Sequence, residues 1–371
     1  MSKIAIVHEW FLDYMGSEKC VESFTNLYPA ADIFSLIDFL NDDDRNRILK
    51  GKRAETSFIQ KLPKSKTSHR SYLPLYPLAV EQLDISDYEI ILSSSHSVAK
   101  GVLSNSKQLH ICYCHTPMRY AWDLYHQYIH ESGLSSGLKG YFAKYFLHKI
   151  RIWDFISSQR VDHFIANSNY IAKRIKKNYG REAEVIYPPV DVDKFQLSNK
   201  KGDYYLIVAR FVPYKKVDIA IKAFKNLPDK KLVVVGSGPD EEKLRSLASS
   251  NVEFLGYQSD EKLTELMRNA KAFIYTAEED FGITIVEAQA AGTPVIAYGV
   301  GGASETVLHG KTGLLFNEQT EDSLIHAIKE FEQSSGMDPD GIREHALQFS
   351  RDRFENEIQE FINKKYSEFK K

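Results

Sequence analysis

Short runs of β-branched and aromatic residues alternate with amphipathic segments along most of this chain. The runs that we expect to form strands are IAIV, YEIILSSS, LHICYCH, DHFIANS, YYLIVAR, KLVVVGSG, KAFIYTA and TPVIAY. The segments between them place apolar residues three and four positions apart, which is the spacing of a helix with one buried face. Strands that alternate with helices favour parallel sheets covered by helices on both faces, so the pattern predicts an α/β fold.

Two adjacent prolines divide this pattern near its middle. In VIYPPVDVDKF, Pro188 and Pro189 interrupt any regular element, and a new strand is expected to begin at about Tyr204. The chain has 371 residues, which is more than a single hydrophobic core usually organises. We therefore predict two doubly wound, Rossmann-like domains, formed by residues 1–187 and 188–350.

The last segment, RDRFENEIQEFINKKYSEFKK, is predicted to form a separate amphipathic helix over residues 351–371. Its apolar residues recur at helical spacing and share one face, which must be covered by another part of the protein. They are Phe354, Ile358, Phe361 and Ile362.

Composition agrees with a globular, cytoplasmic enzyme. Hydrophobic residues make up 43% of the chain and charged residues 26%, and no apolar run approaches the length of about 20 residues that a membrane span requires. The first residues, MSKIAIVHEWF, begin as a strand and lack a signal-peptide pattern. Cys20, Cys112 and Cys114 have a spacing that fits neither a zinc site nor a redox motif, which favours a reducing compartment.

Positive charge is concentrated in two stretches of the first predicted domain. Residues 45–70 hold nine Lys and Arg against the single Glu55, and residues 139–181 hold ten against Asp154 and Asp162. Aromatic and apolar residues are interleaved with these cations, as suits an anionic membrane surface or a lipid-diphosphate acceptor. A solvated basic face is the simpler alternative. Nucleic acid is not expected as a partner, because no recognisable binding module accompanies the charge.

The most informative chemistry lies in EEDFGITIVEAQAAGTPVIAY, which passes from a glycine-containing loop into a helix. Glu279 lies in the loop, and Glu287 lies about two turns into the helix. The free N–H groups of a helix N-terminus attract an anionic group, and two carboxylates can accept hydrogen bonds from separate hydroxyl clusters. The run therefore predicts a site for a sugar nucleotide.

This run resembles the acid-x7-acid signature of the retaining family-4 glycosyltransferases of GT-B fold. The resemblance extends to the Ala-Gly-Thr-Pro stretch that follows, and it covers nearly the whole chain. It implies two Rossmann-like domains that face a cleft, with the C-terminal helix crossing back to the N-terminal, acceptor-side domain. It also implies that Glu279 contacts hydroxyls of the donor sugar and Glu287 the ribose. The donor-binding residues between these acids are then Phe281, Gly282, Ile283 and Thr284.

The opening of the second domain, YLIVARFVPYKKVDIAIKAF, is similar to the strand-Gly-Arg-Leu-x-x-x-Lys opening of the family's donor domain. Ala209 replaces the usual glycine. The resemblance makes Arg210 and Lys215 the two cations that clamp the donor diphosphate and stabilise the departing nucleotide. Two ordinary surface cations are the alternative.

Three further positions complete the donor side that the resemblance implies. Gly236 follows a strand in VVVGSGPDEEKL, a turn that is common in many folds. Tyr257 and Gln258, in EFLGYQSDEKL, occupy the place where the family builds its base pocket.

A glycine pair follows the two acids. YGVGGASETVLHGKTGLLF resembles the family's Gly-Gly-x-x-Glu loop, in which Gly301 and Gly302 let the backbone approach the sugar or the phosphates. Glu305 in this loop is expected to be a structural partner or a helix cap.

In the first domain, Gly16 lies in YMGSE after the first strand and resembles the glycine of a loop that closes over the donor diphosphate. His115, in YCHTPMRYAWD, matches the family's active-site histidine near the donor sugar. Parallel-sheet enzymes bind ligands at that end of a strand. The residues after it are expected to enter a helix and to shape the acceptor side or to serve as packing and ion-pair residues. They are Arg119, Tyr120, Trp122 and Asp123.

Two acidic motifs are not interpreted as metal sites. Asp191-Val192-Asp193 has an Asp-x-Asp form but follows the proline pair, and Asp42-Asp43-Asp44 has the features of an acidic helix start. No metal is expected to be required, because Arg210 and Lys215 compensate the charge of the diphosphate.

HTPMRYAWD and IYPPVDVDKF resemble most closely the bacterial cell-surface polysaccharide branch of the family, of O-antigen type. This resemblance implies a mannosyltransferase that moves mannose from GDP-mannose, with retention, to a lipid-linked or oligosaccharide acceptor, working in the cytoplasm or peripherally on the inner face of the membrane. The alternatives are a UDP-sugar donor, a sugar-nucleotide 2-epimerase, and a sugar-nucleotide-binding scaffold without catalysis.

Overall fold

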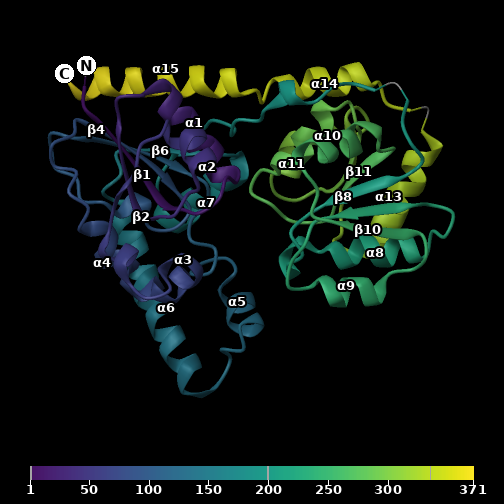
Figure 1. Cartoon of the computed structure of the whole chain (residues 1–371), viewed down its shortest axis with the longest axis horizontal. Helices are drawn as coiled ribbons and strands as arrows, with labels where there is room; N and C mark the ends of the chain where they lie inside the picture. Colours follow the sequence, from purple (N-terminus) through teal and green to yellow (C-terminus); the bar gives the residue numbers. More distant parts are fainter. Residues whose placement is uncertain (1, 199, 335) are drawn as a thin grey trace. The chain divides into compact units, whose positions relative to one another are not determined.

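Two parallel sheets organise the chain, each within its own compact unit (Figure 1). This computed structural model describes residues 2–198, 200–334 and 336–371. The first unit comprises Met1–Tyr187 and Phe354–Lys371, and the second comprises Pro188–Arg353. The prediction of two Rossmann-like, parallel α/β sheets is confirmed.

In the first unit, the described residues form a seven-stranded sheet of order β3-β2-β1-β4-β5-β6-β7, and all its pairings are parallel. The strands are β1 (Ile4–Phe11), β2 (Asp32–Asp38), β3 (Glu55–Thr56), β4 (Ile90–Ser95), β5 (Leu109–Cys114), β6 (His163–Ala166) and β7 (Ala183–Val185). Strands β4 and β5 are buried along their whole length, because helices cover both faces of the sheet.

Side chains of α1, α2 and α15 pack in one apolar cluster with strand residues of this sheet, and side chains of α4 and α6 pack in another. The helices are α1 (Gly16–Leu27), α2 (Asp42–Leu49), α3 (Ser65–Ser68), α4 (Tyr76–Glu81), α5 (Tyr125–Glu131), α6 (Gly137–Ser158), α7 (Asn169–Tyr179) and α15 (Arg351–Phe369). Short 3-10 segments are η1 (Phe58–Lys61), η2 (His69–Leu75) and η3 (Ala99–Gly101).

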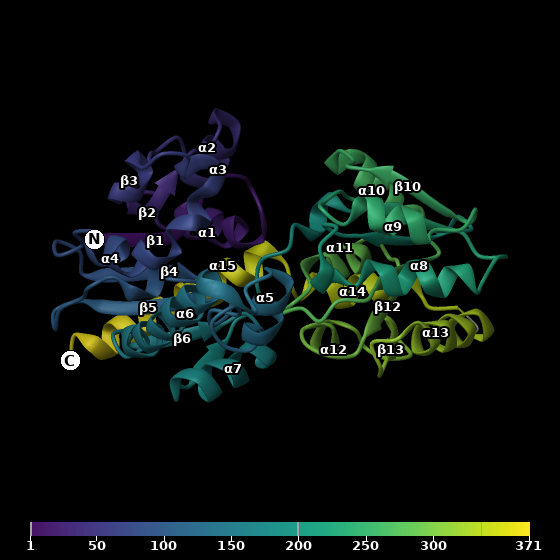
Figure 2. The ribbon, with the colours of Figure 1, turned by 90° about the horizontal axis from the view of Figure 1, so that it is seen from below.

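The second unit repeats this plan in a six-stranded parallel sheet of order β10-β9-β8-β11-β12-β13 among the described residues (Figure 2). Its strands are β8 (Tyr205–Val208), β9 (Leu232–Val235), β10 (Val252–Gly256), β11 (Ala272–Tyr275), β12 (Val295–Tyr298) and β13 (Gly313–Phe316). Helices α8, α9 and α13 share one apolar cluster with this sheet.

The helices of this unit are α8 (Val217–Lys225), α9 (Glu241–Leu247), α10 (Asp260–Asn269), α11 (Ile283–Ala290), α12 (Ala303–Thr306), α13 (Glu321–Gln333) and α14 (Pro339–Leu347). Segments η4 (Val192–Lys194) and η5 (Pro213–Lys215) are 3-10 turns. Each predicted strand is present, but β2, β3, β7, β10 and β13 were not among the predicted runs.

The C-terminal helix α15 begins at the predicted residue, and its apolar face is buried in the core of the first unit. Phe354 stacks on Phe24 of α1 with ring centroids 6.0 Å apart, and Ile358, Phe361 and Ile362 join the same cluster. The prediction of a helix that returns to the N-terminal domain is therefore confirmed. Among the described residues, no helix is long and apolar enough to cross a membrane.

Candidate functional site

Both sheets reverse their strand order beside their first strand. In the second unit the reversal lies between β8 and β11, because β9 and β10 lie on one side of β8 and β11 to β13 on the other. The loops that leave the carboxyl ends of such neighbouring strands diverge to opposite faces, and ligands of open α/β sheets bind in the crevice between them. The loop after β8 holds Arg210 and Lys215, and the loop after β11 holds Glu279.

Lys215 and Glu279 meet across this point of reversal. The Nζ atom of Lys215 lies 2.5 Å from Oε1 of Glu279, and the two side chains are 23% and 15% exposed. Arg210 lies five residues earlier in the same loop and is exposed. The structure thus brings together Lys215 and Glu279, which are 64 positions apart in the sequence. Arg210 is a second cation on the same loop as Lys215.

Thr276 fixes the backbone that carries Lys215. Its buried hydroxyl, just after β11, donates to the carbonyl oxygens of Lys215 and Lys216 at 3.1 and 2.9 Å. Lys216 adopts a left-handed conformation at φ 53°, so the loop turns sharply at this point. Sequence reasoning missed Thr276, although a hydroxyl at the end of a buried strand was a usable signal.

Helix α11 carries the predicted donor-binding residues on its partly exposed side. Gly282 is its N-terminal cap and has φ 84°, a conformation that glycine adopts at little cost. Within the helix, Ile283, Thr284 and Glu287 are partly exposed, whereas the other five residues are buried. Phe281 is also buried, with its ring 5.5 Å from that of Phe349. Phe281 therefore supports the loop from inside.

The glycine pair after β12 is explained by packing against the acid loop. A Cβ on Gly301 would lie 2.3 Å from the carbonyl oxygen of Glu279, and one on Gly302 would lie 2.2 Å from Cα of Phe281. The N–H of Gly302 also donates to the Glu279 carbonyl at 2.8 Å. These glycines therefore let their backbone approach the backbone that carries Glu279, and their approach to a ligand stays a prediction.

Gly301→Ala is therefore expected to displace Glu279. Gly301 has φ 79°, so the substitution adds strain to the clash, for a loss of about 1–3 kcal/mol of unfolding free energy. We expect nucleotide binding to fall by about tenfold or more, measured by calorimetry. Gly310→Ala is the matched control, because Gly310 has φ 77° but its Cβ would meet no described atom within 4 Å. Equal losses of nucleotide binding in both variants would contradict this role.

The remaining predicted donor residues lie at the same edge of the sheet. A Cβ on Gly236 would lie 1.9 Å from the carbonyl oxygen of Ala209, so this glycine is needed for the close approach of two loops. Tyr257, after β10, is 81% exposed. Gln258 is half-buried, and its amide donates to the carbonyl of Leu255 at 2.7 Å. Tyr257 alone of this pair offers a largely exposed side chain.

The first unit also reverses its strand order, between β1 and β4, and a buried polar cluster lies there. His8 Nε2 lies 3.2 Å from Glu18 Oε1, and His8 Nδ1 lies 3.2 Å from Ser94 Oγ. Ser94 Oγ lies 2.8 Å from Nε2 of His115. A continuous chain of contacts therefore links the carboxylate of Glu18, near Gly16 at the start of α1, to the predicted active-site histidine.

The pKa values indicate how protons are arranged in this chain. Burial lowers the pKa of His115 to about 3, aided by His96 and His8, so His115 is neutral above that pH. Burial by itself lowers the pKa of His8, but the hydrogen bond and charge of Glu18, the charge of Glu9 and the Ser94 carbonyl together outweigh burial and raise it above the usual value. His8 Nδ1 lies 3.2 Å from both the carbonyl oxygen and the hydroxyl of Ser94. When His8 is protonated it donates from both nitrogens, which leaves the Ser94 hydroxyl able to donate to Nε2 of a neutral His115 whose own proton is on Nδ1.

Glu9 organises the loop that follows β4. One of its oxygens accepts hydrogen bonds from the N–H groups of His96, Ser97 and Ala99 at 2.9, 2.7 and 3.2 Å. Burial alone would raise the pKa of Glu9, but His96, His8 and these N–H groups lower it to about 2. Glu9 is therefore an ionised structural anchor, and sequence reasoning missed it.

The segment after His115 corrects a prediction. Residues 119–124 form turns, and helix α5 begins only at Tyr125. The Tyr120 hydroxyl bonds to Ser97 at 2.8 Å, the Trp122 indole donates to Asp154 at 2.8 Å, and Asp123 pairs with Arg174. These contacts hold the turns in place, which supports the packing and ion-pair interpretation.

The acidic motifs have structural partners. Asp191 pairs with Arg351 at 2.8 Å, and Asp42, Asp43 and Asp44 form the first turn of α2. Glu305 lies in the first turn of the short helix α12. Within residues 2–198, 200–334 and 336–371, no group of three or more His, Cys, Asp or Glu side chains could hold a metal ion.

Comparison with known proteins identifies the family of both units. Residues 39–194 match the family described as Glycosyltransferase Family 4, and residues 191–349 match Glycosyl transferases group 1. An uncharacterized glycosyltransferase of Methanocaldococcus jannaschii is 32% identical over 205 residues, covering 53% of this chain and 54% of that protein. The D-inositol 3-phosphate glycosyltransferase of Mycobacteroides abscessus is 32% identical over 191 residues, covering 45% and 43%. The chain thus spans about half the length of the curated relatives it matches.

Solved structures resemble the whole chain in fold. HepE of Anabaena in complex with UDP and glucose has a TM-score of 0.72 at 19% identity, covering 98% of this chain and 100% of HepE. Sucrose-phosphate synthase of Thermosynechococcus elongatus has a TM-score of 0.72 at 16% identity, covering 99% and 100%. Together, the sequence matches and this architecture show that the chain belongs to the group 1, family 4 glycosyltransferases of GT-B fold.

Proposed function

We propose that this protein transfers a hexose, with retention, from a nucleotide sugar to a hydroxyl group of an acceptor. The ion pair between Lys215 and Glu279, at the strand reversal of the second sheet, is the observation that carries this proposal. A cation at this position can neutralise a diphosphate, and a carboxylate beside it can accept hydrogen bonds from sugar hydroxyls. The donor site is then formed by Lys215, Arg210, Glu279 and the exposed side of α11.

In the proposed reaction, an acceptor oxygen forms a bond to the anomeric carbon of the sugar while the bond to the leaving diphosphate breaks on the same face. The leaving diphosphate takes the proton of the acceptor hydroxyl. Negative charge grows on the diphosphate as the bond breaks, so Lys215 and Arg210 stabilise the transition state more than the bound donor. The family resemblance further assigns to His115 a hydrogen bond to the hydroxyls of the donor sugar, and Ser94 Oγ contacts Nε2 of this histidine at 2.8 Å.

We further propose GDP-mannose as the donor and a lipid-linked or oligosaccharide acceptor in cell-surface polysaccharide synthesis, at the inner face of the membrane. Support for this choice comes from the HTPMRYAWD and IYPPVDVDKF segments. A UDP-sugar is the competing donor. HepE was crystallised with UDP and glucose, but its 19% identity to this chain makes it a guide to fold alone.

Thermal stability in the presence of nucleotides tests the donor site. A ligand at 100 times its dissociation constant adds roughly 2.7 kcal/mol to the free energy of unfolding. We expect GDP and GDP-mannose to raise the melting temperature more than UDP, ADP and their hexose conjugates. The increase should disappear in Arg210→Ala and Glu287→Ala. Stabilisation by UDP alone would overturn the choice of donor, and no stabilisation by any nucleotide would overturn the proposed function.

A further inference from the structure

Helix α6 has a broad apolar face that the protein leaves exposed. One side of the helix packs on the first unit through Leu147, Ile150 and Asp154. The opposite side carries large apolar residues with exposures of 40–80%. They are Leu138, Tyr141, Phe142, Tyr145, Phe146, Ile152, Phe155 and Ile156.

The exposed large apolar residues of the protein are concentrated on α6. Most of them are spaced three, four or seven positions apart, so they share one face. In the part of the chain that the structure describes, 17 large hydrophobic residues are exposed, and eight of them lie on these 22 helical positions. Single exposed apolar residues are normal on protein surfaces, but a continuous patch marks a site of interaction.

The charges on α6 indicate what covers this face. Lys139, Lys144, Lys149 and Arg151 lie along the helix, and its one acidic residue is Asp154. Asp154 is fully buried and paired with Lys100, so it does not offset these cations. An apolar face that carries cations within it and along its edges, and no acidic side chain, is complementary to a bilayer of anionic lipids.

We propose that the exposed face of α6 docks on the surface of an anionic phospholipid bilayer, with the helix lying in the plane of the interface. This inference rests on the proposed transfer to a lipid-linked acceptor, and it assigns the membrane contact to one helix. The aromatic and aliphatic side chains enter the acyl region, while the lysines contact lipid phosphates.

The basic stretch 45–70 lacks the features for such insertion. Of its large apolar residues, Ile48, Leu49 and Ile59 are fully buried and Phe58 and Leu62 are partly buried, and Arg45 is buried in a pair with Asp38. The cations that remain exposed there can add long-range attraction to anionic lipids, but no large apolar side chain within the stretch is exposed beside them. The structure therefore distinguishes two stretches that looked equivalent in sequence.

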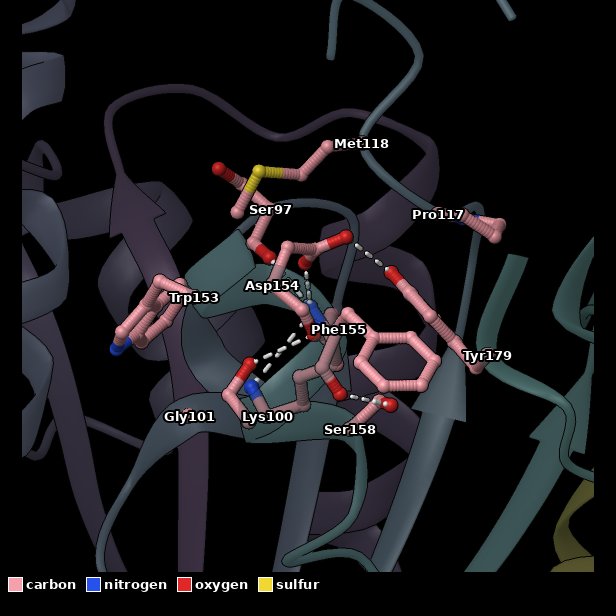
Figure 3. Close-up of polar contacts among 12 residues, drawn as sticks. Ser97, Lys100, Gly101, Pro117, Met118, Trp153, Asp154, Phe155, Ser158 and Tyr179 are labelled. Carbon is pink, nitrogen blue, oxygen red and sulfur yellow. Dashed lines mark hydrogen bonds and ion pairs between the residues drawn. The ribbon is translucent and has the colours of Figure 1, made fainter. Parts of the chain in front are cut away.

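A buried network fixes α6 to the first unit (Figure 3). Asp154 accepts a hydrogen bond from the Tyr179 hydroxyl at 2.8 Å, in addition to its ion pair with Lys100. It also accepts a hydrogen bond from the Trp122 indole at 2.8 Å. The Trp153 indole donates to Glu81 at 2.8 Å. All these anchors lie in the C-terminal half of the helix, and its N-terminal half projects from the unit beside α5 (Figure 1). A rigid, projecting helix is suited to carry an insertion face.

Co-sedimentation of the full chain with vesicles tests this proposal. The vesicles contain phosphatidylcholine alone or phosphatidylcholine with phosphatidylglycerol. Three triple variants are compared with the wild type: L138Q/F142Q/Y145Q removes part of the apolar face, K139Q/K144Q/K149Q removes its lysines, and L78Q/L103Q/L347Q replaces exposed leucines elsewhere.

We expect the wild type and the leucine control to bind the anionic vesicles, and added salt to weaken this binding. The lysine variant should bind roughly 100-fold more weakly, since each cation near an anionic surface contributes about a factor of five. The apolar variant should lose about 100-fold or more. Absent binding by the wild type, or equal binding by all variants, would overturn the proposal. A wild-type dimer that the apolar variant converts to monomer would also overturn it, because a second copy would then cover the face.

Nucleotide binding in vesicle-free solution separates this inference from the proposed function. The apolar variant should keep the wild-type thermal shift with nucleotide, because its substitutions lie in the first unit, outside the donor-site residues. Loss of vesicle binding together with this retained shift supports the docking face. If nucleotide raised the melting temperature of the wild type but the wild type bound no vesicles, the proposed docking face would be wrong. The proposed donor site would still be supported.

Discussion

Lys215→Ala is expected to lower kcat/KM for sugar transfer by about 10²–10³-fold, the usual cost of removing one preorganised group from a developing negative charge. Lys215 is suited to this role because Thr276 fixes its backbone and Glu279 holds its ammonium group at 2.5 Å. The loss should appear mainly in kcat, since the charge on the diphosphate grows in the transition state. Steady-state release of nucleoside diphosphate measures both constants.

Lys222→Ala is the matched control, because Lys222 pairs with Asp218 at 3.0 Å on α8 with its side chain 44% exposed. This variant should transfer sugar at the wild-type rate. Glu279→Gln should impair both donor binding and turnover, because it weakens the hold on Lys215 as well as the contact to sugar hydroxyls. A Lys215→Ala enzyme with wild-type kcat would show that this cation does not act on the leaving group.

Lys100→Met is expected to lower the unfolding free energy of the first unit by about 3–5 kcal/mol, because it leaves the buried carboxylate of Asp154 without its cation. Side-chain exposure is 2% for Lys100 and 0% for Asp154. Burial by itself lowers the pKa of Lys100, but the adjacent carboxylate outweighs burial and raises it above the usual value. Lys100 therefore carries its charge throughout the neutral pH range.

Urea unfolding followed by tryptophan fluorescence is suited to this measurement, because Trp10, Trp122 and Trp153 are the three tryptophans of the chain and all precede residue 188. Lys176→Met is the control. Lys176 pairs with Glu182, but both side chains are more than half exposed, so the loss should stay below about 1 kcal/mol. Similar losses in the two variants would contradict the structural importance of the buried pair.

The central strands were predictable because they are continuous apolar runs bounded by turn residues. Strand β2, DIFSLID, was missed, although five of its residues are buried between β1 and β3. Ser35 interrupts the short apolar run that the two aspartates flank, and it is tolerated inside because its hydroxyl donates to the carbonyl of Ile37 at 2.9 Å. Partners of this kind depend on tertiary structure and leave no local signal.

The candidate site was predictable in its residue types but not in its geometry. The pairing of Lys215 with Glu279 depends on β8 and β11 being neighbours, and sheet order is not encoded in local spacing. Gly301 and Gly302 were recognised for their lack of a side chain, yet the surface that they approach proved to be the backbone of the acid loop. Ser94 was not singled out, because its role depends on a strand pairing that brings His8 beside it.

The exposed face of helix α6 was likewise not predictable from the local sequence. Its sequence mixes apolar and basic residues around the whole helix, so hydrophobic periodicity did not distinguish the side that packs from the side that remains exposed. Asp154 lies on the packed side, where it contacts Lys100, Trp122 and Tyr179, and these partners depend on the tertiary structure. The sequence alone therefore did not show which apolar residues of α6 face outward.

The most direct test of the proposed function is NMR of the products formed from GDP-mannose, UDP-glucose and related donors with a bacterial lipid extract as acceptor. We expect one donor, GDP-mannose, to yield a glycosylated lipid whose anomeric configuration equals that of the donor, with one nucleoside diphosphate released per sugar transferred. Lys215→Ala should abolish most of this product. Conversion of the donor to its C2 epimer, transfer with inversion, or nucleotide binding without any turnover would contradict retaining sugar transfer.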